Sequence, residues 1–280
     1  MKWWPSPAKL NLFLHITGRR ADGYHELQSI FQMLDYGDRL AFEVIPNDGQ
    51  IILETPIDGV ANDDNLIVKA AKLLQHHTNT TFGCKIWLEK NLPMGGGIGG
   101  GSSNAATTLC VLNHLWQCGL SDNELAKLGL QLGADVPVFV HGNTAFASGV
   151  GEQLTPVKIP SAYYLVVFPN CHISTAAIFG APELPRNSAK IEIDDYDFDL
   201  TRNDCQDLVI NRYPKVAKLL QWLINYAPSR MTGTGACVFA TFEQESDALA
   251  VMQQLPPKWQ GFVAKGVECS PLKLALGKHS

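Results

Sequence analysis

Six of the seven residues between Gly95 and Gly101 are glycine, and Ile98 is the exception. So many glycines cost backbone entropy, so the segment must do more than turn the chain. Glycine lets backbone N–H groups converge on a ligand, and Ser102 and Ser103 begin a helical pattern whose N-terminal amides favour an anion. We interpret the stretch as a phosphate-binding loop. A flexible linker is the alternative, but a linker would not lie between a strand pattern and an amphipathic helix.

The loop fits neither of the two common classes of phosphate loop. A Walker A loop needs a lysine before its Ser or Thr, whereas Gly101 is followed directly by Ser102. A dinucleotide fingerprint can be drawn through Gly95, Gly97 and Gly100, but any polyglycine run matches it. The strand that should follow such a fingerprint is replaced by two helical patterns. The cation that balances the phosphate charge must therefore come from elsewhere in the chain.

Two charged residues are candidates for chemistry beside the loop. Lys9 shares a face with Asn11 in an alternating strand pattern at residues 8–16. A half-exposed edge strand with its lysine in water is an equally good interpretation. Asp135 precedes the apolar residues 136–140, so its carboxylate is expected to be partly desolvated and to need a cationic partner. On the residues alone, an ordinary turn aspartate is the simpler interpretation.

The periodicity predicts alternating strands and helices around these residues. Strands are expected at residues 8–16, 40–45, 50–55, 84–90, 164–168 and 238–242. Helices are expected at residues 66–76, 102–118, 121–132 and 216–226, with polar residues 62–65 capping the first and a Ser121/Glu124 capping box starting the third. Pro156 and Pro160 bracket a polar segment that we take as a domain boundary. The predicted domains are residues 1–156 and 157–280.

The composition of the 280 residues excludes several classes of protein. A net charge of −5 and a pI near 5.9 argue against a nucleic-acid partner. Seven scattered cysteines without a Cys-x-x-Cys pair indicate reduced, mostly buried thiols. The acidic cluster at residues 194–199 is interpreted as a solvated loop. Residues 1–5 lack the apolar core of a signal peptide and no run is long enough for a membrane helix, so we expect a cytoplasmic protein without a membrane partner.

Three separated motifs together resemble one enzyme superfamily. They are Pro-Ala-Lys-Leu-Asn at residues 7–11, the loop at residues 93–106, and Thr-Gly-Thr-Gly-Ala-Cys at residues 232–237. In this order they are similar to the motifs of the galactokinase, homoserine kinase, mevalonate kinase and phosphomevalonate kinase (GHMP kinase) superfamily. The resemblance implies a two-domain α+β fold with an N-terminal ATP-binding domain, a C-terminal substrate domain and a cleft between them.

Within the superfamily, the match is closest to the branch that uses ATP to phosphorylate the 2-hydroxyl of 4-(cytidine 5'-diphospho)-2-C-methyl-D-erythritol in the non-mevalonate isoprenoid pathway. The matching segments also include residues 5–12, 21–25, 64–67 and 133–137, so the resemblance covers essentially the full chain. A superfamily kinase with another alcohol, such as mevalonate or homoserine, is one alternative. A nucleotide-binding regulator without catalysis is the other, and an intact Lys9 and Asp135 argue against it.

The resemblance also assigns roles to particular residues. Lys9 and Asp135 match the catalytic lysine and aspartate, and Asn65 and Lys90 match positions near adenine. The loop residues expected to hold ATP are Pro93, Met94, Gly95, Gly96, Gly97, Ile98, Gly99, Gly100, Gly101, Ser102 and Ser103. The residues expected to contact the substrate are Tyr24, His25 and Phe179 at the cytidine, with Asn11 and Thr175 as further contacts. Residues 171–179 are where the chain departs most from the family pattern.

The expected cofactors are ATP and Mg²⁺. Several superfamily members hold the metal partly through an acid on the helix after the loop, but residues 102–118 contain no Asp or Glu. Because Mg²⁺ keeps many of its waters, ATP phosphates and water are expected to hold it, and no protein ligand is assigned. The expected partner is the small-molecule substrate, and the expected assembly is a monomer or a weak homodimer.

Overall fold

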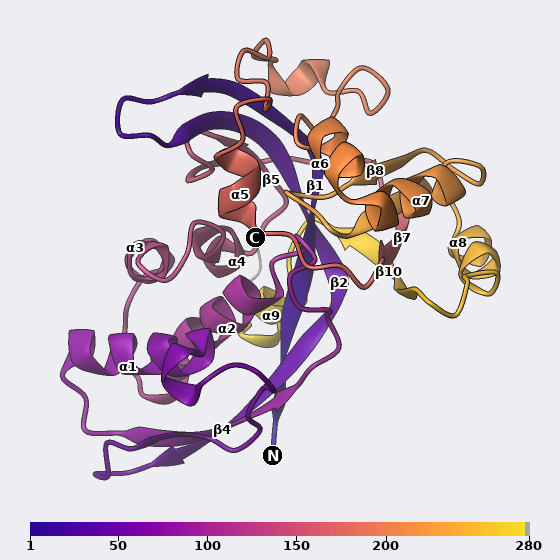
Figure 1. The fold of residues 1–280 in the computed structure, drawn as a ribbon. Helices are drawn as coiled ribbons and strands as arrows, with labels where there is room; N and C mark the ends of the chain where they lie inside the picture. The colour runs from indigo at the N-terminus through magenta and orange to yellow at the C-terminus, as the bar shows by residue number, and fades with distance from the viewer. Residues whose placement is uncertain (278–280) are drawn as a thin grey trace.

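A hairpin of two long antiparallel strands, β1 (Trp3–Arg19) and β2 (His25–Ile45), runs through the centre of the molecule (Figure 1). The structure is a computed structural model that describes residues 1–277. Residues 278–280, at the end of the predicted C-terminal domain, lie outside the described residues. β2 also pairs with strands from both halves of the chain, so the hairpin joins them.

The strands of the described residues form one mixed sheet, in the order β3-β4-β2-β10-β7-β9-β8. β1 pairs with β2 outside this path, as do β5 with β2 and β6 with β5. The remaining strands are β3 (Ile51–Leu53), β4 (Gly83–Glu89), β5 (Ala145–Ser148), β6 (Gln153–Pro156), β7 (Tyr163–Phe168), β8 (Ser229–Met231), β9 (Val238–Phe242) and β10 (Gln260–Val267).

Helices pack beside the sheet in two groups (Figure 1). The first group is α1 (Leu66–Thr78), α2 (Gly100–Leu115), α3 (Asp122–Leu130) and α4 (Val136–His141). The second is α5 (Thr175–Phe179), α6 (Gln206–Arg212), α7 (Pro214–Leu223) and α8 (Glu245–Met252). The last helix of the described residues is α9 (Pro271–Ala275). Short 3₁₀ turns lie at Asn62–Asp64 and Ile193–Asp195. This mixture of helices and antiparallel strands confirms the predicted α+β class.

Three apolar cores hold these layers together. One lies under α1 to α4 and includes Leu109 and Phe139, and a second lies under α6 to α8 and includes Leu165. The third core, around Phe13 and Phe239, is formed by side chains of β1, β2, β7, β9 and β10. α9 returns to pack on β1, and its Leu272 belongs to the first core. The end of the described chain therefore contributes to the N-terminal half.

Local signals in the sequence predicted many elements correctly. The strands at residues 84–90, 164–168 and 238–242 are present, and so are the helices after Asn65, Ser102 and Ser121. The capping box of Ser121 and Glu124 is formed. None of the seven cysteines, all within the described residues, forms a disulfide, four of them are buried, and the acids of residues 194–199 are exposed, as predicted. Among residues 1–277, no helix is long and apolar enough to span a membrane.

The interpretation of Lys9 as a lysine in water is wrong. β1 has a ladder partner on one side only, but its other edge is covered by loops. The backbone N–H of Lys9 donates to Ile98 O at 3.1 Å, and that of Leu14 donates to Arg202 O at 3.0 Å. The Lys9 side chain is therefore buried. Residues 25–39 of β2, together with β5, β6, β8 and β10, were not predicted.

Candidate active site

The glycine-rich loop lies against the Thr232–Cys237 motif. The Cys237 N–H donates to Gly96 O at 3.0 Å, and a Cβ on Gly97 would lie 2.6 Å from Thr232 O. Left-handed backbone, which glycine adopts without strain, occurs at Gly95, Gly97 and Gly99. The glycines therefore let two distant motifs pack backbone against backbone. This is a second reason for glycine, in addition to the anion that the sequence suggested.

The loop leads directly into α2, whose N-terminus is open. The helix begins at Gly100, two residues before the predicted start, and its N-cap Gly99 supplies no side-chain cap. The Ser103 N–H makes the first helical hydrogen bond, donating to Gly99 O at 2.8 Å. The amides of Gly100, Gly101 and Ser102 precede that bond and have no helical acceptor, which is the arrangement that attracts phosphate.

A cavity of about 570 Å³ lies in front of this helix end. Most of the predicted site residues line it, namely Lys9, Asn11, Asn65, Lys90, residues 93–102, Asp135, Thr175 and Phe179. Three predicted residues do not. Ser103 is buried where Ser6 Oγ donates to its Oγ at 3.0 Å, and Tyr24 and His25 lie outside the cavity wall.

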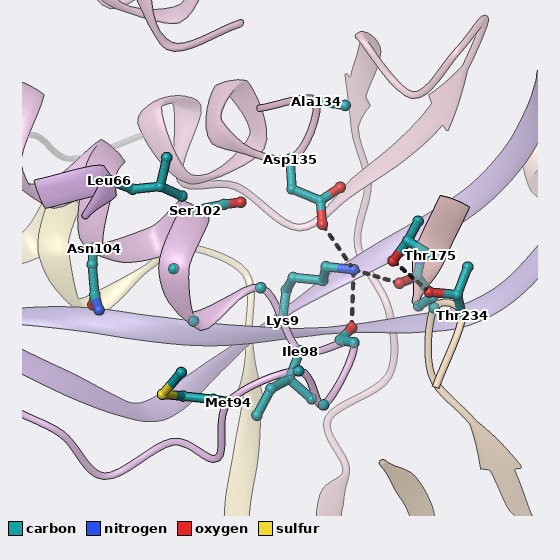
Figure 2. A pocket seen from close by; sticks show the side chains of 18 of the residues that line it. Lys9, Leu66, Met94, Ile98, Ser102, Asn104, Ala134, Asp135, Thr175 and Thr234 are labelled. Carbon is teal, nitrogen blue, oxygen red and sulfur yellow. Dashed lines mark hydrogen bonds and ion pairs between the residues drawn. The ribbon is translucent and has the colours of Figure 1, made fainter. Parts of the chain in front are cut away.

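Lys9 is the centre of a side-chain cluster in this cavity (Figure 2). Its Nζ lies 3.4 Å from Asp135 Oδ2 and donates to Asn11 Oδ1 at 2.5 Å and to Gly97 O at 3.3 Å. Two of the three N–H donors of the ammonium are thus used within the protein, and its charge is paired with Asp135. The Lys9 side chain is 3% exposed and that of Asp135 is 38% exposed. The ammonium is therefore held from the protein side, while the carboxylate is open to the cavity.

The position of Asp135 follows from the short helix that it precedes. Asp135 is the N-cap residue of α4, but its side chain makes no capping hydrogen bond. Residues 136–140 of α4 are buried, which anchors the helix in the first core. The carboxylate is thus free to face Lys9, and it has the cationic partner that its apolar surroundings require. It is more exposed than the apolar sequence suggested, because it lies at the cavity wall.

Asn65 and Lys90 lie on another side of the same cavity. The Asn65 Oδ1 caps α1 by accepting from the Ile67 N–H at 2.9 Å, while its buried Nδ2 has no partner among the described residues. Lys90 Nζ donates to Asp38 Oδ2 at 2.6 Å, and the buried Asp38 also accepts from the backbone of residues 91 and 92. Both side chains are held in place, and Asn65 keeps a donor for a ligand.

The side of the cavity formed by α5 is less tightly built. Phe179 stacks on His25, with ring centroids 5.3 Å apart, and Arg186 Nε donates to His25 Nε2 at 3.0 Å. Burial lowers the pKa of His25, and the charges of Arg186 and Arg19 lower it further. Tyr24 is 66% exposed at the tip of the β1–β2 hairpin. Only Phe179 of these rings reaches the cavity.

Comparisons with known proteins identify the family. Models of the GHMP kinases N terminal domain and the GHMP kinases C terminal region match residues 65–143 and 187–260. A 4-diphosphocytidyl-2-C-methyl-D-erythritol kinase of Pseudoalteromonas atlantica is 67% identical over 281 residues, which cover 99% of this chain and 98% of the relative. The chain belongs to the 4-diphosphocytidyl-2-C-methyl-D-erythritol kinase family. A member from Shewanella loihica is 59% identical, with 99% and 97% of the two chains covered.

Solved structures agree with this family. The crystal structure of a 4-(cytidine 5'-diphospho)-2C-methyl-D-erythritol kinase is 28% identical with a TM-score of 0.84, and the match covers 95% of this chain and 100% of that one. Mevalonate kinase of Methanococcus jannaschii shares the fold at 18% identity and a TM-score of 0.66, over 95% and 98% of the chains. The predicted GHMP kinase fold is confirmed. The chain is a small-molecule kinase, and GHMP kinases take the phosphoryl group from ATP.

Several residues that build the site of this family member were not singled out in the sequence. Asp38 holds Lys90, Arg186 holds His25, and Thr234 Oγ1 lies 2.9 Å from Thr175 Oγ1. None of these pairs has a regular sequence spacing. The Thr232–Cys237 motif supported the superfamily resemblance, but its contact with the glycine-rich loop required the fold.

Proposed function

We propose that this chain uses ATP to phosphorylate the 2-hydroxyl of 4-(cytidine 5'-diphospho)-2-C-methyl-D-erythritol in isoprenoid precursor biosynthesis. The names of the relatives support this substrate. The observation that carries the proposal is the Lys9–Asp135 pair, 3.4 Å apart at the cavity wall beside the open N-terminus of α2. Transfer of a phosphoryl group to an alcohol passes through a loose transition state, so positioning and charge stabilisation supply most of the catalysis.

In this mechanism Asp135 accepts the proton of the attacking hydroxyl. The transfer occurs late, because a carboxylate is far too weak a base for an alcohol in its ground state. Lys9 orients the carboxylate and balances its charge at 3.4 Å. Two of the three ammonium donors are used by Asn11 Oδ1 and Gly97 O, and the longer of these two hydrogen bonds, to Gly97 O at 3.3 Å, is the one that Lys9 would release to contact the transferring phosphoryl group.

The ATP site in this proposal combines the glycine loop with the side of the cavity at Asn65. Residues 93–102, which line the cavity, are placed around the phosphates, and the amides at the start of α2 donate to them. Asn65 Nδ2, a buried donor without a partner among the described residues, suits a ring nitrogen of adenine, with Lys90 close by in the cavity wall. These donors fit ATP.

Mg²⁺ bound with ATP would neutralise charge on the phosphates. Within residues 1–277, no group of three or more acidic, His or Cys side chains is arranged to hold a metal ion. The cavity wall contains two carboxylates, Asp64 and Asp135, and Asp64 accepts from Lys69 Nζ at 3.1 Å. We therefore propose that phosphates and water hold the ion, with Asp135 as the one carboxylate facing the reaction.

The cytidine is proposed to bind at the opposite side, between the rings of Tyr24 and Phe179, with His25 at the edge of the base. Aromatic rings stack on every base, and polar atoms choose among them. Thr175 and Asn11 are proposed to contact the remainder of the substrate from the cavity wall. We further propose two domains, residues 1–156 and 157–280, in a cytoplasmic monomer or weak homodimer.

The test is ATP-dependent release of ADP with three alcohols: the cytidine diphosphate methylerythritol, mevalonate and homoserine. We expect strong turnover with the cytidine substrate only. In the phosphorus NMR spectrum of the product, the signal of the newly added phosphate should be a singlet, because carbon 2 carries a methyl group and no hydrogen. Turnover with mevalonate or homoserine but not with the cytidine compound would contradict the proposed substrate. No turnover with any of the three alcohols would contradict the proposed kinase activity.

A further inference from the structure

An irregularity in the central hairpin lies close to Lys9. β1 and β2 are in register at Asn11 opposite Phe31 and again at Leu14 opposite Ser29, with a register shift between these pairs. β1 therefore spans three steps where β2 spans two, which is a bulge in β1. The carbonyl of Phe13 lies in this bulge, and it accepts a hydrogen bond from Ser29 Oγ at 2.6 Å.

This bond determines what the Ser29 hydroxyl can do on its other side. A hydroxyl has one proton to donate, and here that proton goes to Phe13 O. Toward Asn11 the oxygen can only accept, and it does so from Asn11 Nδ2 at 2.8 Å. The carboxamide of Asn11 is therefore oriented with Nδ2 toward Ser29 and with Oδ1 toward Lys9. Thr232 Oγ1 holds the backbone of the same residue, at 2.9 Å from the Asn11 N–H.

The orientation matters because a carboxamide has two unlike ends. With Oδ1 toward Lys9, the ammonium gains an acceptor at 2.5 Å. If the Asn11 carboxamide were rotated by 180°, its NH₂ group would face the Lys9 ammonium. Both groups are hydrogen-bond donors, so no hydrogen bond could form between them. Ser29 itself is buried and does not line the cavity, so it touches neither ATP nor the alcohol. Any effect that it has on the reaction must pass through Asn11.

We propose that Ser29 is a positioning residue of the kinase, which aims Lys9 at Asp135 by fixing the orientation of the Asn11 carboxamide. The inference rests on the proposed function, in which Lys9 and Asp135 carry the phosphoryl transfer. Without the Ser29 hydroxyl, nothing holds Asn11 Nδ2, so the carboxamide can turn away and Lys9 loses its acceptor for part of the time. The ion pair at 3.4 Å is then no longer held in one geometry.

The experiment compares Ser29→Ala with Ser188→Ala. Ser188 is a matched control, because it is also buried, its Oγ donates to Asp204 at 2.6 Å and accepts from Arg202 at 2.9 Å, and it lies outside the cavity wall. We expect kcat of Ser29→Ala to fall about 10- to 100-fold, because small misplacements of catalytic groups cost that much. The KM values for ATP and for the alcohol should change by about twofold at most, since bound ground states do not use the Lys9 geometry.

A second comparison separates positioning from a general loss of structure. Ser29→Thr, which keeps the hydroxyl, should restore most of the kcat that Ser29→Ala loses. In an Asn11→Ala background, Ser29→Ala should have no further effect on kcat, because nothing remains to be oriented. Thermal unfolding of each variant checks that the proteins are folded.

The outcomes distinguish this inference from the proposed function. If the wild type turns over and Ser29→Ala matches it in kcat, the positioning role is overturned and the kinase proposal stands. If Ser29→Ala lowers kcat by the same factor with and without Asn11, Ser29 acts by another route and the inference is again wrong. If the wild type does not turn over the cytidine substrate, the proposed function fails first.

Discussion

The two ends of the cavity are built in different ways. At one end, the Lys9 side chain is 3% exposed, its ammonium donates to Asn11 Oδ1 and Gly97 O, and it forms an ion pair with Asp135. At the other end, Tyr24 is 66% exposed and lies outside the cavity wall, and His25 contacts Phe179 and Arg186 instead of the cavity. The first end is preorganised before any ligand binds, and the second must adapt to its ligand.

This contrast matches the demands of the proposed reaction. Phosphoryl transfer needs charged groups that do not reorganise during the reaction. A buried lysine that is held by hydrogen bonds and an ion pair meets this need. Stacking on a base needs area more than precise angles, and a ring that closes on its ligand supplies that area. Substitutions at the first end should therefore lower kcat, and substitutions at the second should raise KM.

The largest effect is expected at the preorganised end. Lys9→Met removes the ammonium but keeps much of the apolar stem, so kcat should fall about 10²- to 10³-fold, as for other lost charge-stabilising donors. Steady-state ADP release measures this loss. Lys2→Met is the control, because Lys2 is exposed, lies over the Trp4 ring at 3.6 Å and does not line the cavity. Equal kcat in the two variants would contradict the role of Lys9.

The backbone of the glycine loop should be nearly as intolerant. Gly97→Ala places a Cβ 2.6 Å from Thr232 O at a positive φ of 74°, so we expect the free energy of unfolding to fall by about 2–4 kcal/mol. Gly23→Ala, at a φ of 90° with open space around it, should cost only about 1 kcal/mol. Urea unfolding measures both. Equal losses would mean that packing against Thr232 contributes nothing.

At the adaptable end, Phe179→Ala removes one stacking surface for the cytidine. The KM for the cytidine substrate should rise about 10-fold, in line with the free energy of stacking one base on one ring. The kcat at saturating substrate and the KM for ATP should stay close to those of the wild type. A large fall in kcat without a change in KM would place Phe179 with the preorganised end instead.

The smallest effect is expected from Arg186, which acts through charge. Burial and the neighbouring arginines lower the pKa of His25 from 6.5, so His25 stays neutral at neutral pH, and binding to the base should weaken only as the pH falls through this lowered pKa. Arg186→Met removes one positive charge and should raise the pKa of His25, so the KM rise on acidification begins at a higher pH. Profiles of kcat/KM for the cytidine substrate against pH measure this shift.

Arg212→Met is the control for the pH experiment, because Arg212 pairs with the exposed Glu183 at 2.8 Å and is not among the charges that act on His25. Its pH profile should match that of the wild type. Profiles of Arg186→Met that also match the wild type would show that His25 does not contribute to substrate binding.

The fold was predictable where the signal is local. Asn65 and the Ser121/Glu124 pair indicate where helices begin, because capping hydrogen bonds span only two or three residues. The first half of β2 was missed because Ser29 and Gln32 are polar residues inside the sheet. Their partners, Asn11 on β1 and Thr144 just before β5, lie in other parts of the chain. A buried polar residue in a strand is invisible to an alternation pattern until its partner is known.

The site was predictable mainly through resemblance. Lys9 and Asp135 are far apart in the sequence, and no spacing rule joins a residue in a strand to the N-cap of a distant helix. The motif match brought them together, and the structure adds the bonds that hold them. Asp38 and Arg186, which position Lys90 and His25, belong to no motif in the sequence and required the fold.

Binding and turnover measured together on Asp135→Asn test the central claim most directly. The substitution keeps the size of the side chain and removes the group that accepts the proton. The account predicts that calorimetry finds the Kd for ATP unchanged, while kcat with the cytidine substrate falls about 10²- to 10⁴-fold, the usual contribution of a general base. A variant that binds ATP and retains near-normal kcat would contradict the assignment of Asp135, and with it the proposed mechanism.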